Sequence, residues 1–115
     1  MTLDPTCIFC KIIEGEIPAE ILYRNENVLA FNDLNPQAPT HVLIIPTLHA
    51  ESAAQVAAIS PTIIAGLHKA ADEIAAERSL TGYRTVFNTG ADAGQSVFHA
   101  HLHLLGGRGL AWPPG

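Results

Sequence analysis

The pattern of apolar and polar positions predicts a chain of short strands with one long helix. Short apolar runs, several of them alternating with polar residues and bounded by turn residues, are typical of strands. They occur at residues 21–24, 28–31, 41–45, 83–88 and 97–105. Residues 25–27 are turn-like, so the first two strands should form a hairpin.

Helical periodicity is clearest after Ser60, where apolar residues recur about every 3.6 positions. Ser60 suits the N-cap and Pro61 the first helical position, and the helix should end before Gly82. A shorter helical turn is expected at residues 7–14, ended by Gly15. Together these elements predict one α+β domain over residues 1–115, with an antiparallel sheet of about five strands. Residues 106–115 should form a tail without regular structure.

Three histidines alternate in the last predicted strand, at His99, His101 and His103. Alternate residues of a strand point to the same face, so the three imidazoles should line one surface. Imidazoles change charge near neutral pH and serve in proton transfer, nucleophilic attack and metal binding. The alternative without a function is a half-exposed strand whose polar face happens to carry histidine.

A loop of small residues, 89–96, leads directly into the histidine strand. Gly90 and Gly94 allow main-chain amides to converge on an anion, Ser96 adds a hydroxyl, and Asn88 adds an amide. An ordinary strand connection is the alternative. Beside a phosphate pocket, a neutral imidazole nitrogen can attack phosphorus. His101, with a histidine on either side, is best placed as that nucleophile.

Cys7 and Cys10 form a Cys-x-x-Cys pair. In a cytosolic chain this spacing indicates metal binding or redox chemistry before a structural disulfide. Zinc takes four nitrogen or sulfur ligands, and His49 and His99 are available to complete such a set. The alternative is a pair of reduced thiols packed in a helix.

Composition narrows the classes of partner. Hydrophobic residues make up 48% of the chain and charged residues 15%, which favours an additional buried surface, most simply a homodimer. The net charge is −5 and no basic run occurs, which argues against a nucleic-acid polymer. No apolar run approaches the roughly 20 residues of a membrane span. The first residues lack a signal-peptide pattern, so we expect a cytoplasmic protein. Trp112, in the tail, should pack on its own core or on a partner subunit.

These residues together resemble the histidine triad (HIT) superfamily, and within it the Hint branch. The signature His, apolar, His, apolar, His, apolar, apolar matches residues 99–105, and the terminal Trp-Pro-Pro-Gly matches residues 112–115. The resemblance implies an α+β domain whose sheet continues into that of its mate in a homodimer. It also implies hydrolysis of purine nucleoside 5'-phosphoramidates, with release of AMP from AMP-amine or AMP-lysine substrates.

The resemblance further implies roles for individual residues. His101 would become nucleotidylated, supported by His103 and His41, with Ser96 assisting the leaving group. Phosphate would be held around Asn88, Gly94, Gln95 and Ser96, and ribose by Asp33. The base pocket would comprise Ile8, Phe9, Ile12, Phe31 and Leu34, and Trp112 would reach the partner's active site.

Bacterial-type members with Cys-x-x-Cys imply a structural zinc on Cys7, Cys10, His49 and His99, and phosphoryl chemistry that needs no metal. One departure is the stretch before His49, which has Thr47-Leu48 where a lysine is usual. Two other functions stay open. One is a dinucleoside polyphosphate hydrolase of the Fhit branch, against which the tail argues. The other is a nucleotide- or zinc-binding interaction protein with little turnover.

Overall fold

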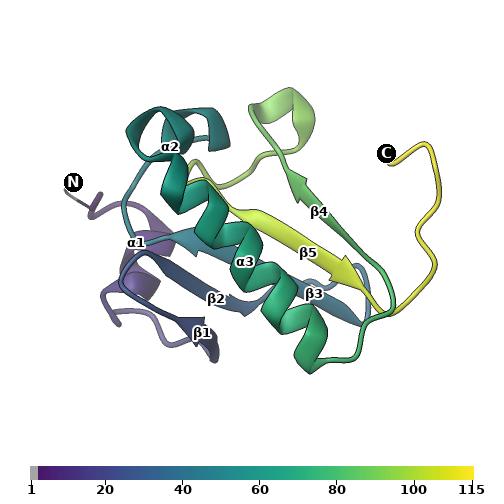
Figure 1. The fold of residues 1–115 in the computed structure, drawn as a ribbon. Coiled ribbons are helices and arrows are strands. Elements are labelled where there is room, and N and C mark those ends of the chain that lie inside the picture. The colour runs from purple at the N-terminus through teal and green to yellow at the C-terminus, as the bar shows by residue number, and fades with distance from the viewer. Residues whose placement is uncertain (1–2) are drawn as a thin grey trace.

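The computed structural model describes residues 3–115, whose five strands form one antiparallel sheet in the order β1-β2-β3-β5-β4 (Figure 1). The strands are β1 (Ile21–Arg24), β2 (Val28–Asn32), β3 (Thr40–Pro46), β4 (Tyr83–Phe87) and β5 (Leu102–Gly106). β1 and β2 form the expected hairpin. The predicted α+β class with an antiparallel five-stranded sheet is confirmed.

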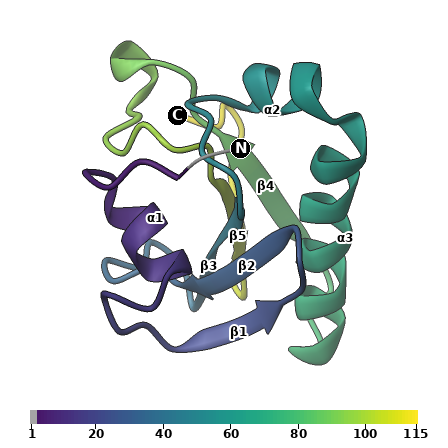
Figure 2. The ribbon, with the colours of Figure 1, turned by 90° about the vertical axis from the view of Figure 1, so that its left-hand side faces the viewer.

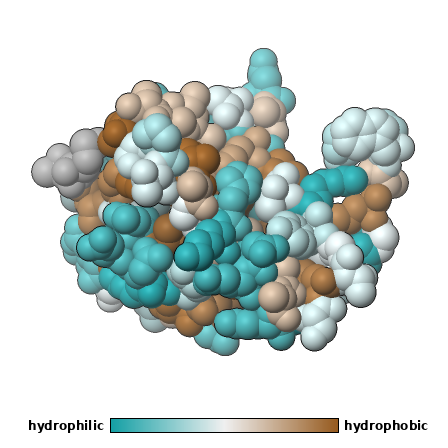
Figure 3. All heavy atoms as spheres, in the orientation of Figure 1, coloured by the Kyte–Doolittle hydropathy of each residue, from teal (hydrophilic) through white to brown (hydrophobic). Residues whose placement is uncertain are grey.

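Helices cover both faces of the sheet. α3 (Pro61–Glu77) packs across one face and α1 (Ile8–Ile13) lies on the other (Figure 2). Ser60 is the N-cap of α3 and Pro61 its first residue, as the sequence predicts. Polar side chains cover much of the face shown in Figure 3, where α3 meets solvent. Within residues 3–115, no helix combines the length and the apolar character needed to cross a membrane.

The central strands are buried on both sides because each face has its own cluster of apolar side chains. Alternate residues of β2, β3 and β5 pack under α3, including Ala30, Ile44 and Leu104. The intervening residues of β2 and β3, such as Leu29 and Ile45, pack under α1. Burial on both faces explains why these strands are continuous apolar runs in the sequence. α1 and α3 therefore lie on opposite faces of the sheet.

One helix was not predicted. α2 (Ala53–Ile59) follows Ser52, whose hydroxyl accepts a hydrogen bond from the Gln55 amide as an N-cap. Val56 is its one fully buried residue, so α2 lacks the wide apolar stripe by which α3 is recognised. The one sequence feature here that indicates a helix start is Ser52, a typical N-cap residue.

The histidine strand is shorter than predicted. β5 begins at Leu102, so only His103 of the three histidines lies in a strand, and the expectation that one strand face carries all three is wrong. The residues just before Leu102 do not pair with the neighbouring strands. The Ala100 amide donates to the Ala50 carbonyl, and the buried His99 ring lies among residues of the N-terminal segment.

The C-terminal tail starts from a close contact with the loop before β3. Gly107 has φ +90°, and a Cβ at this position would lie 2.9 Å from the Cβ of Pro39. Arg84 of β4 then donates to the carbonyl of Ala111. Gly106, placed in the tail by the sequence, is instead the last residue of β5. The rest of the tail is irregular, as expected.

Gly107→Ala should destabilise the protein by about 2 kcal/mol, because the positive φ disfavours an L side chain and the new methyl group would crowd Pro39. Chemical denaturation monitored by circular dichroism would measure the loss. Gly109→Ala is the matched control, since a Cβ at that residue would meet no atom within 4 Å. Equal stabilities of the two variants would contradict this account of the tail.

Candidate active site and metal-binding cluster

His41 and His103 meet because of the register between β3 and β5. Leu43 pairs with His103 and His41 pairs with Leu105, so the two histidines are diagonal neighbours on one face of the sheet. Their rings have centroids 5.1 Å apart, and His41 Nε2 lies 2.8 Å from His103 Nδ1. This face is the one on which α1 lies.

The orientation of His101 leaves one ring nitrogen free for reaction. Its Nδ1 lies 2.7 Å from the carbonyl oxygen of His99, an acceptor, so Nδ1 carries the proton and donates it. Nε2 of the neutral ring therefore has an available lone pair. The ring is buried, with its face set by an edge-on contact with Phe9 at 5.2 Å and by His103 at 5.0 Å.

A chain of hydrogen bonds determines which nitrogen of His103 bears a proton. The main-chain N–H of Gln37 can only donate, and it donates to His41 Nδ1 at 3.0 Å. The single proton of neutral His41 is therefore on Nε2, which donates to His103 Nδ1. Neutral His103 in turn carries its proton on Nε2. Among residues 3–115, this Nε2 is a buried side-chain nitrogen without a hydrogen-bond partner.

Burial keeps both supporting histidines neutral. Desolvation lowers the pKa of His103 to about 4, helped by the neighbouring His101 and His41 rings. Desolvation also lowers the pKa of His41, partly offset by the Asp33 carboxylate. At neutral pH the site thus presents the uncharged N–H of His103 next to the His101 ring.

Asp33 completes this group, at the end of β2. One carboxylate oxygen accepts the Asn35 amide at 2.8 Å, and the other lies 3.4 Å from His41 Nε2. Asp33, His41 and His103 therefore bring three donor atoms together. They do not suit a cation, because the Gln37 N–H occupies His41 Nδ1 and keeps the proton on the nitrogen that a metal would need. The arrangement fits a hydrogen-bond network.

A second cluster does fit a metal. The sulfur atoms of Cys7 and Cys10 and the Nδ1 atoms of His49 and His99 lie within 4.8 Å of one another. Cys10 Sγ lies 3.4 Å from His49 Nδ1 and 3.6 Å from His99 Nδ1, Cys7 Sγ lies 3.5 Å from His99 Nδ1, and the two nitrogens are 3.2 Å apart. A tetrahedral zinc ion with ordinary bond lengths has ligand atoms about 3.3 to 3.8 Å apart. The four residues predicted as ligands are thus brought together in suitable geometry.

Local structure orients these ligands. Cys7 is the N-cap of α1, and its sulfur accepts a hydrogen bond from the Cys10 amide. His99 donates from Nε2 to the Pro46 carbonyl, which leaves Nδ1 as the ligand atom. Burial raises the pKa of the Cys10 thiol to about 11 and lowers the pKa of His99 to about 4. The cluster therefore gains a thiolate at Cys10 most readily when a cation is bound.

An apolar cavity of about 210 Å³ lies between α1 and the end of β2. Four residues of the predicted base pocket line it, namely Ile8, Ile12, Phe31 and Leu34. The cavity is also lined by Ile17, Pro18, Ala19, Glu20 and Asn32. Phe9 is not a lining residue: it is buried beneath the cavity, with its ring against Phe31 and His101.

The loop before the histidines is shaped by the Gln95 side chain. Gln95 is buried, accepts from the Gly90 amide, and donates to the carbonyls of Glu51 and Val97. Its side-chain amide is therefore occupied within the protein. Gly94 has φ +92° at the C-cap of the short 3-10 turn η1 (Ala91–Ala93), which leaves the following Ser96 exposed.

The remaining predicted residues lie at the edges of this region. Asn88 follows the end of β4 and is half-buried. Trp112 is 81% exposed in the single chain. Sequence reasoning missed the main-chain partners, the Gln37 N–H and the Pro46 carbonyl. Main-chain groups are the same at every non-proline residue, so no side-chain signal could have identified them.

Comparison with known proteins shows the family of the chain. The HIT domain matches residues 14–110. A 14 kDa zinc-binding protein from Zea mays is 47% identical over 115 residues, covering 97% of this chain and 90% of the relative. A HIT family hydrolase from Legionella pneumophila superposes with a TM-score of 0.90 at 47% identity, covering 96% and 100% of the two chains. A histidine triad nucleotide-binding protein from Candida albicans gives a TM-score of 0.81 at 32% identity, covering 96% and 85%. With its histidine network, its Cys/His cluster and these relatives, the chain belongs to the HIT family.

Proposed function

We propose that the protein is a purine nucleoside 5'-phosphoramidate hydrolase that acts through a nucleotidylated His101. The observation that carries the proposal is the pairing of two imidazoles whose hydrogen bonds orient a ring nitrogen of each toward the site. His101 offers a lone pair on Nε2, and His103 offers an unpartnered N–H beside it. A nucleophile next to a fixed donor suits attack on a phosphorus atom whose oxygens gain charge.

In the first step, His101 Nε2 forms a bond to phosphorus and the P–N bond of the substrate breaks. The amine leaves with a proton, supplied by the Ser96 hydroxyl or by water. The His99 carbonyl, already bonded to His101 Nδ1–H, stabilises the positive charge that the ring acquires. In the second step, water forms a bond to phosphorus and the P–Nε2 bond breaks. The proton that this water loses restores the Ser96 hydroxyl or passes to solvent, and the nucleoside monophosphate is released.

His103 contributes as a neutral donor. Its low pKa disfavours a role as a proton-delivering imidazolium, whereas its N–H can bond a phosphate oxygen throughout the reaction. Asn88 and the main-chain amides of Gly94 and Ser96 would bind the other oxygens. Asp33 would hold the ribose hydroxyls, and the apolar cavity under Leu34 would take the base.

His101→Ala should abolish AMP release from an adenosine phosphoramidate, lowering kcat by at least about a thousandfold because no nucleophile remains. A coupled AMP assay would measure turnover, and intact mass after rapid quench would detect the nucleotidylated wild-type enzyme. His68→Ala removes an exposed histidine of α3 and serves as the control. Turnover by His101→Ala at the wild-type rate would contradict the mechanism.

The same assay separates the alternatives. A preference for diadenosine polyphosphate over phosphoramidate would indicate an Fhit-type hydrolase. Tight AMP binding with negligible turnover on every phosphoramidate would indicate an interaction protein. The tail sequence Trp-Pro-Pro-Gly favours the phosphoramidate.

We also propose that the Cys/His cluster holds a structural zinc ion, which would tie the N-terminal segment to the loop carrying His99. The ligand geometry and the zinc-binding relative from Zea mays support this assignment. Both cysteines are free thiols, a state typical of the cytoplasm, where we place the protein.

Cys10→Ser should reduce bound zinc from about one ion per chain to near zero, since one thiolate of the tetrahedral set is lost. Elemental analysis of purified protein would measure the metal, and thermal unfolding should show a lower Tm. His68→Asn is the control for a histidine outside the cluster. Equal zinc content in Cys10→Ser and wild-type protein would refute the assignment.

We further propose a homodimer in which the sheet continues across β4. β4 is an edge strand, and large apolar side chains are exposed at Tyr83, Phe98 and Trp112. An unpaired edge with apolar neighbours favours pairing with a second copy.

Sedimentation equilibrium should therefore give a mass about twice the 12.2 kDa of the chain. A second copy would also place a tail near each active site, where Trp112 would be buried. A mass equal to that of one chain at micromolar concentration would exclude the dimer.

A further inference from the structure

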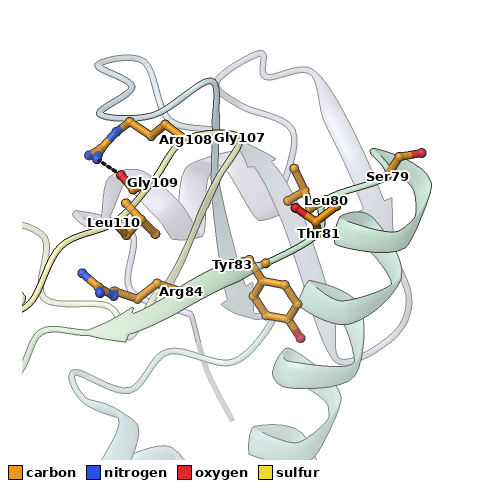
Figure 4. A pocket seen from close by; sticks show the side chains of 10 residues that line it. Ser79, Leu80, Thr81, Tyr83, Arg84, Gly107, Arg108, Gly109 and Leu110 are labelled. Carbon is orange, nitrogen blue, oxygen red and sulfur yellow. Dashed lines mark hydrogen bonds between the residues drawn. The ribbon is translucent and has the colours of Figure 1, made fainter.

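The hydrogen-bond chain that ends at His103 extends beyond the histidines to an exposed arginine in the tail. Arg108 donates from Nε and from one Nη to the carbonyl oxygen of Gln37, at 3.1 and 3.0 Å. Its other Nη donates to the carbonyl of Gly109 at 2.9 Å (Figure 4). The guanidinium thus bridges the tail and the residue whose amide contacts His41.

Gln37 is an exposed residue of the loop 33–39, in which Ala38 is buried and Asp33 is half-buried. Its own side chain donates to the Asn35 carbonyl within the same loop. Two residues of the C-terminal tail contact this loop. The Arg108 guanidinium donates two hydrogen bonds, here called the Arg108 fork, to the Gln37 carbonyl, and Gly107 lies against Pro39. An arginine fork on one carbonyl oxygen is a charge-assisted bond and is stronger than an ordinary one.

Displacement of Gln37 would alter the donor that faces the substrate. Without the Gln37 N–H, His41 Nδ1 is free to carry the proton, and its Nε2 then becomes an acceptor toward His103. His103 would respond by carrying its proton on Nδ1, which leaves a lone pair on Nε2. A lone pair repels a phosphate oxygen, whereas the N–H present in this structure attracts it.

We propose that Arg108 is a positioning residue for the active site. By gripping the Gln37 carbonyl, it keeps the Gln37 N–H on His41 and thereby keeps the His103 proton on Nε2. The tail is in this way coupled to the histidines through four consecutive residues: Arg108, Gln37, His41 and His103. The consequence for catalysis rests on the proposed phosphoramidate hydrolysis, but the consequence for the tautomers does not.

Arg84 provides a matched control because it also bonds the tail. It projects from β4 beside the same hollow of about 640 Å³ as Arg108, as Figure 4 shows, and donates to the Ala111 carbonyl. Among its side-chain hydrogen bonds in residues 3–115, none reaches the loop that carries Gln37. Arg84→Gln thus removes one positive charge and one hydrogen bond to the tail, as Arg108→Gln does, but it leaves the hydrogen bonds from Arg108 to the Gln37 carbonyl in place.

Nitrogen-15 NMR of histidine-labelled protein would test the tautomers directly. In wild-type protein, His41 Nδ1 and His103 Nδ1 should show shifts of unprotonated nitrogens. In Arg108→Gln, both should move toward the protonated range, and in Arg84→Gln neither should move. Unchanged shifts in Arg108→Gln, or equal changes in the two variants, would overturn the proposal.

Arg108→Lys guards against a variant that fails to fold. Lysine keeps the charge but lacks the fork, so it should give shifts between those of wild type and Arg108→Gln. Thermal unfolding of each variant would separate a local change from global destabilisation. If Arg108→Lys folds and has wild-type shifts, the fork has no role in setting the tautomers.

Kinetics give a second readout. In Arg108→Gln, kcat for the phosphoramidate should fall about tenfold with a smaller change in KM, because the donor to the phosphate is misplaced while the base cavity is untouched. Arg108→Lys should recover part of the loss. If wild-type protein does not turn over phosphoramidates, the proposed function fails while the NMR result still decides the role of Arg108. Changes in KM alone would contradict the positioning role.

Discussion

A neutral imidazole has one N–H and one lone pair, and this constraint governs the whole site. His41, His99, His101 and His103 lie close together, so the partner of one nitrogen in a ring decides which nitrogen of that ring carries the proton. Main-chain groups supply the decisive partner for three of them: the Gln37 N–H for His41, the Pro46 carbonyl for His99, and the His99 carbonyl for His101. Because main-chain groups are held by the fold, the tautomers are set before any substrate arrives.

His99 joins the two halves of the site. Its side chain belongs to the Cys/His cluster, and its carbonyl accepts a hydrogen bond from His101. Both contacts are made by the loop that precedes β5, and β5 begins at Leu102, after His101. The alternation of the three histidines therefore does not reflect one strand face with three equal rings. It separates the His99 ring, in the Cys/His cluster, from the His101 and His103 rings, which lie against each other.

The two faces of the sheet carry different kinds of residue: one is covered by apolar packing, and the other carries the histidines. Apolar residues under α3 form the largest buried cluster, so that face is closed. On the other face, α1 is short and leaves room for the histidines, the apolar cavity and the Cys/His cluster around it. The loop before β3 and the tail after β5 meet at the edge of this face. Their contact links the C-terminal segment to the histidines through Arg108.

Much of the protein was determined by local sequence. The period of the apolar residues and the Ser60–Pro61 cap identified α3, and the apolar runs identified five strands, because these signals act over a few residues. The residue types His, Cys and Gly also indicated imidazole and metal chemistry, and the family resemblance supplied the set of metal ligands. Residue spacing did not reveal that β5 begins after His101, or which nitrogen of each ring bears the proton. Those features depend on contacts between residues far apart in the chain, such as Cys7 with His99, and on main-chain groups that carry no side-chain identity. Only the tertiary structure brings such groups within hydrogen-bonding distance.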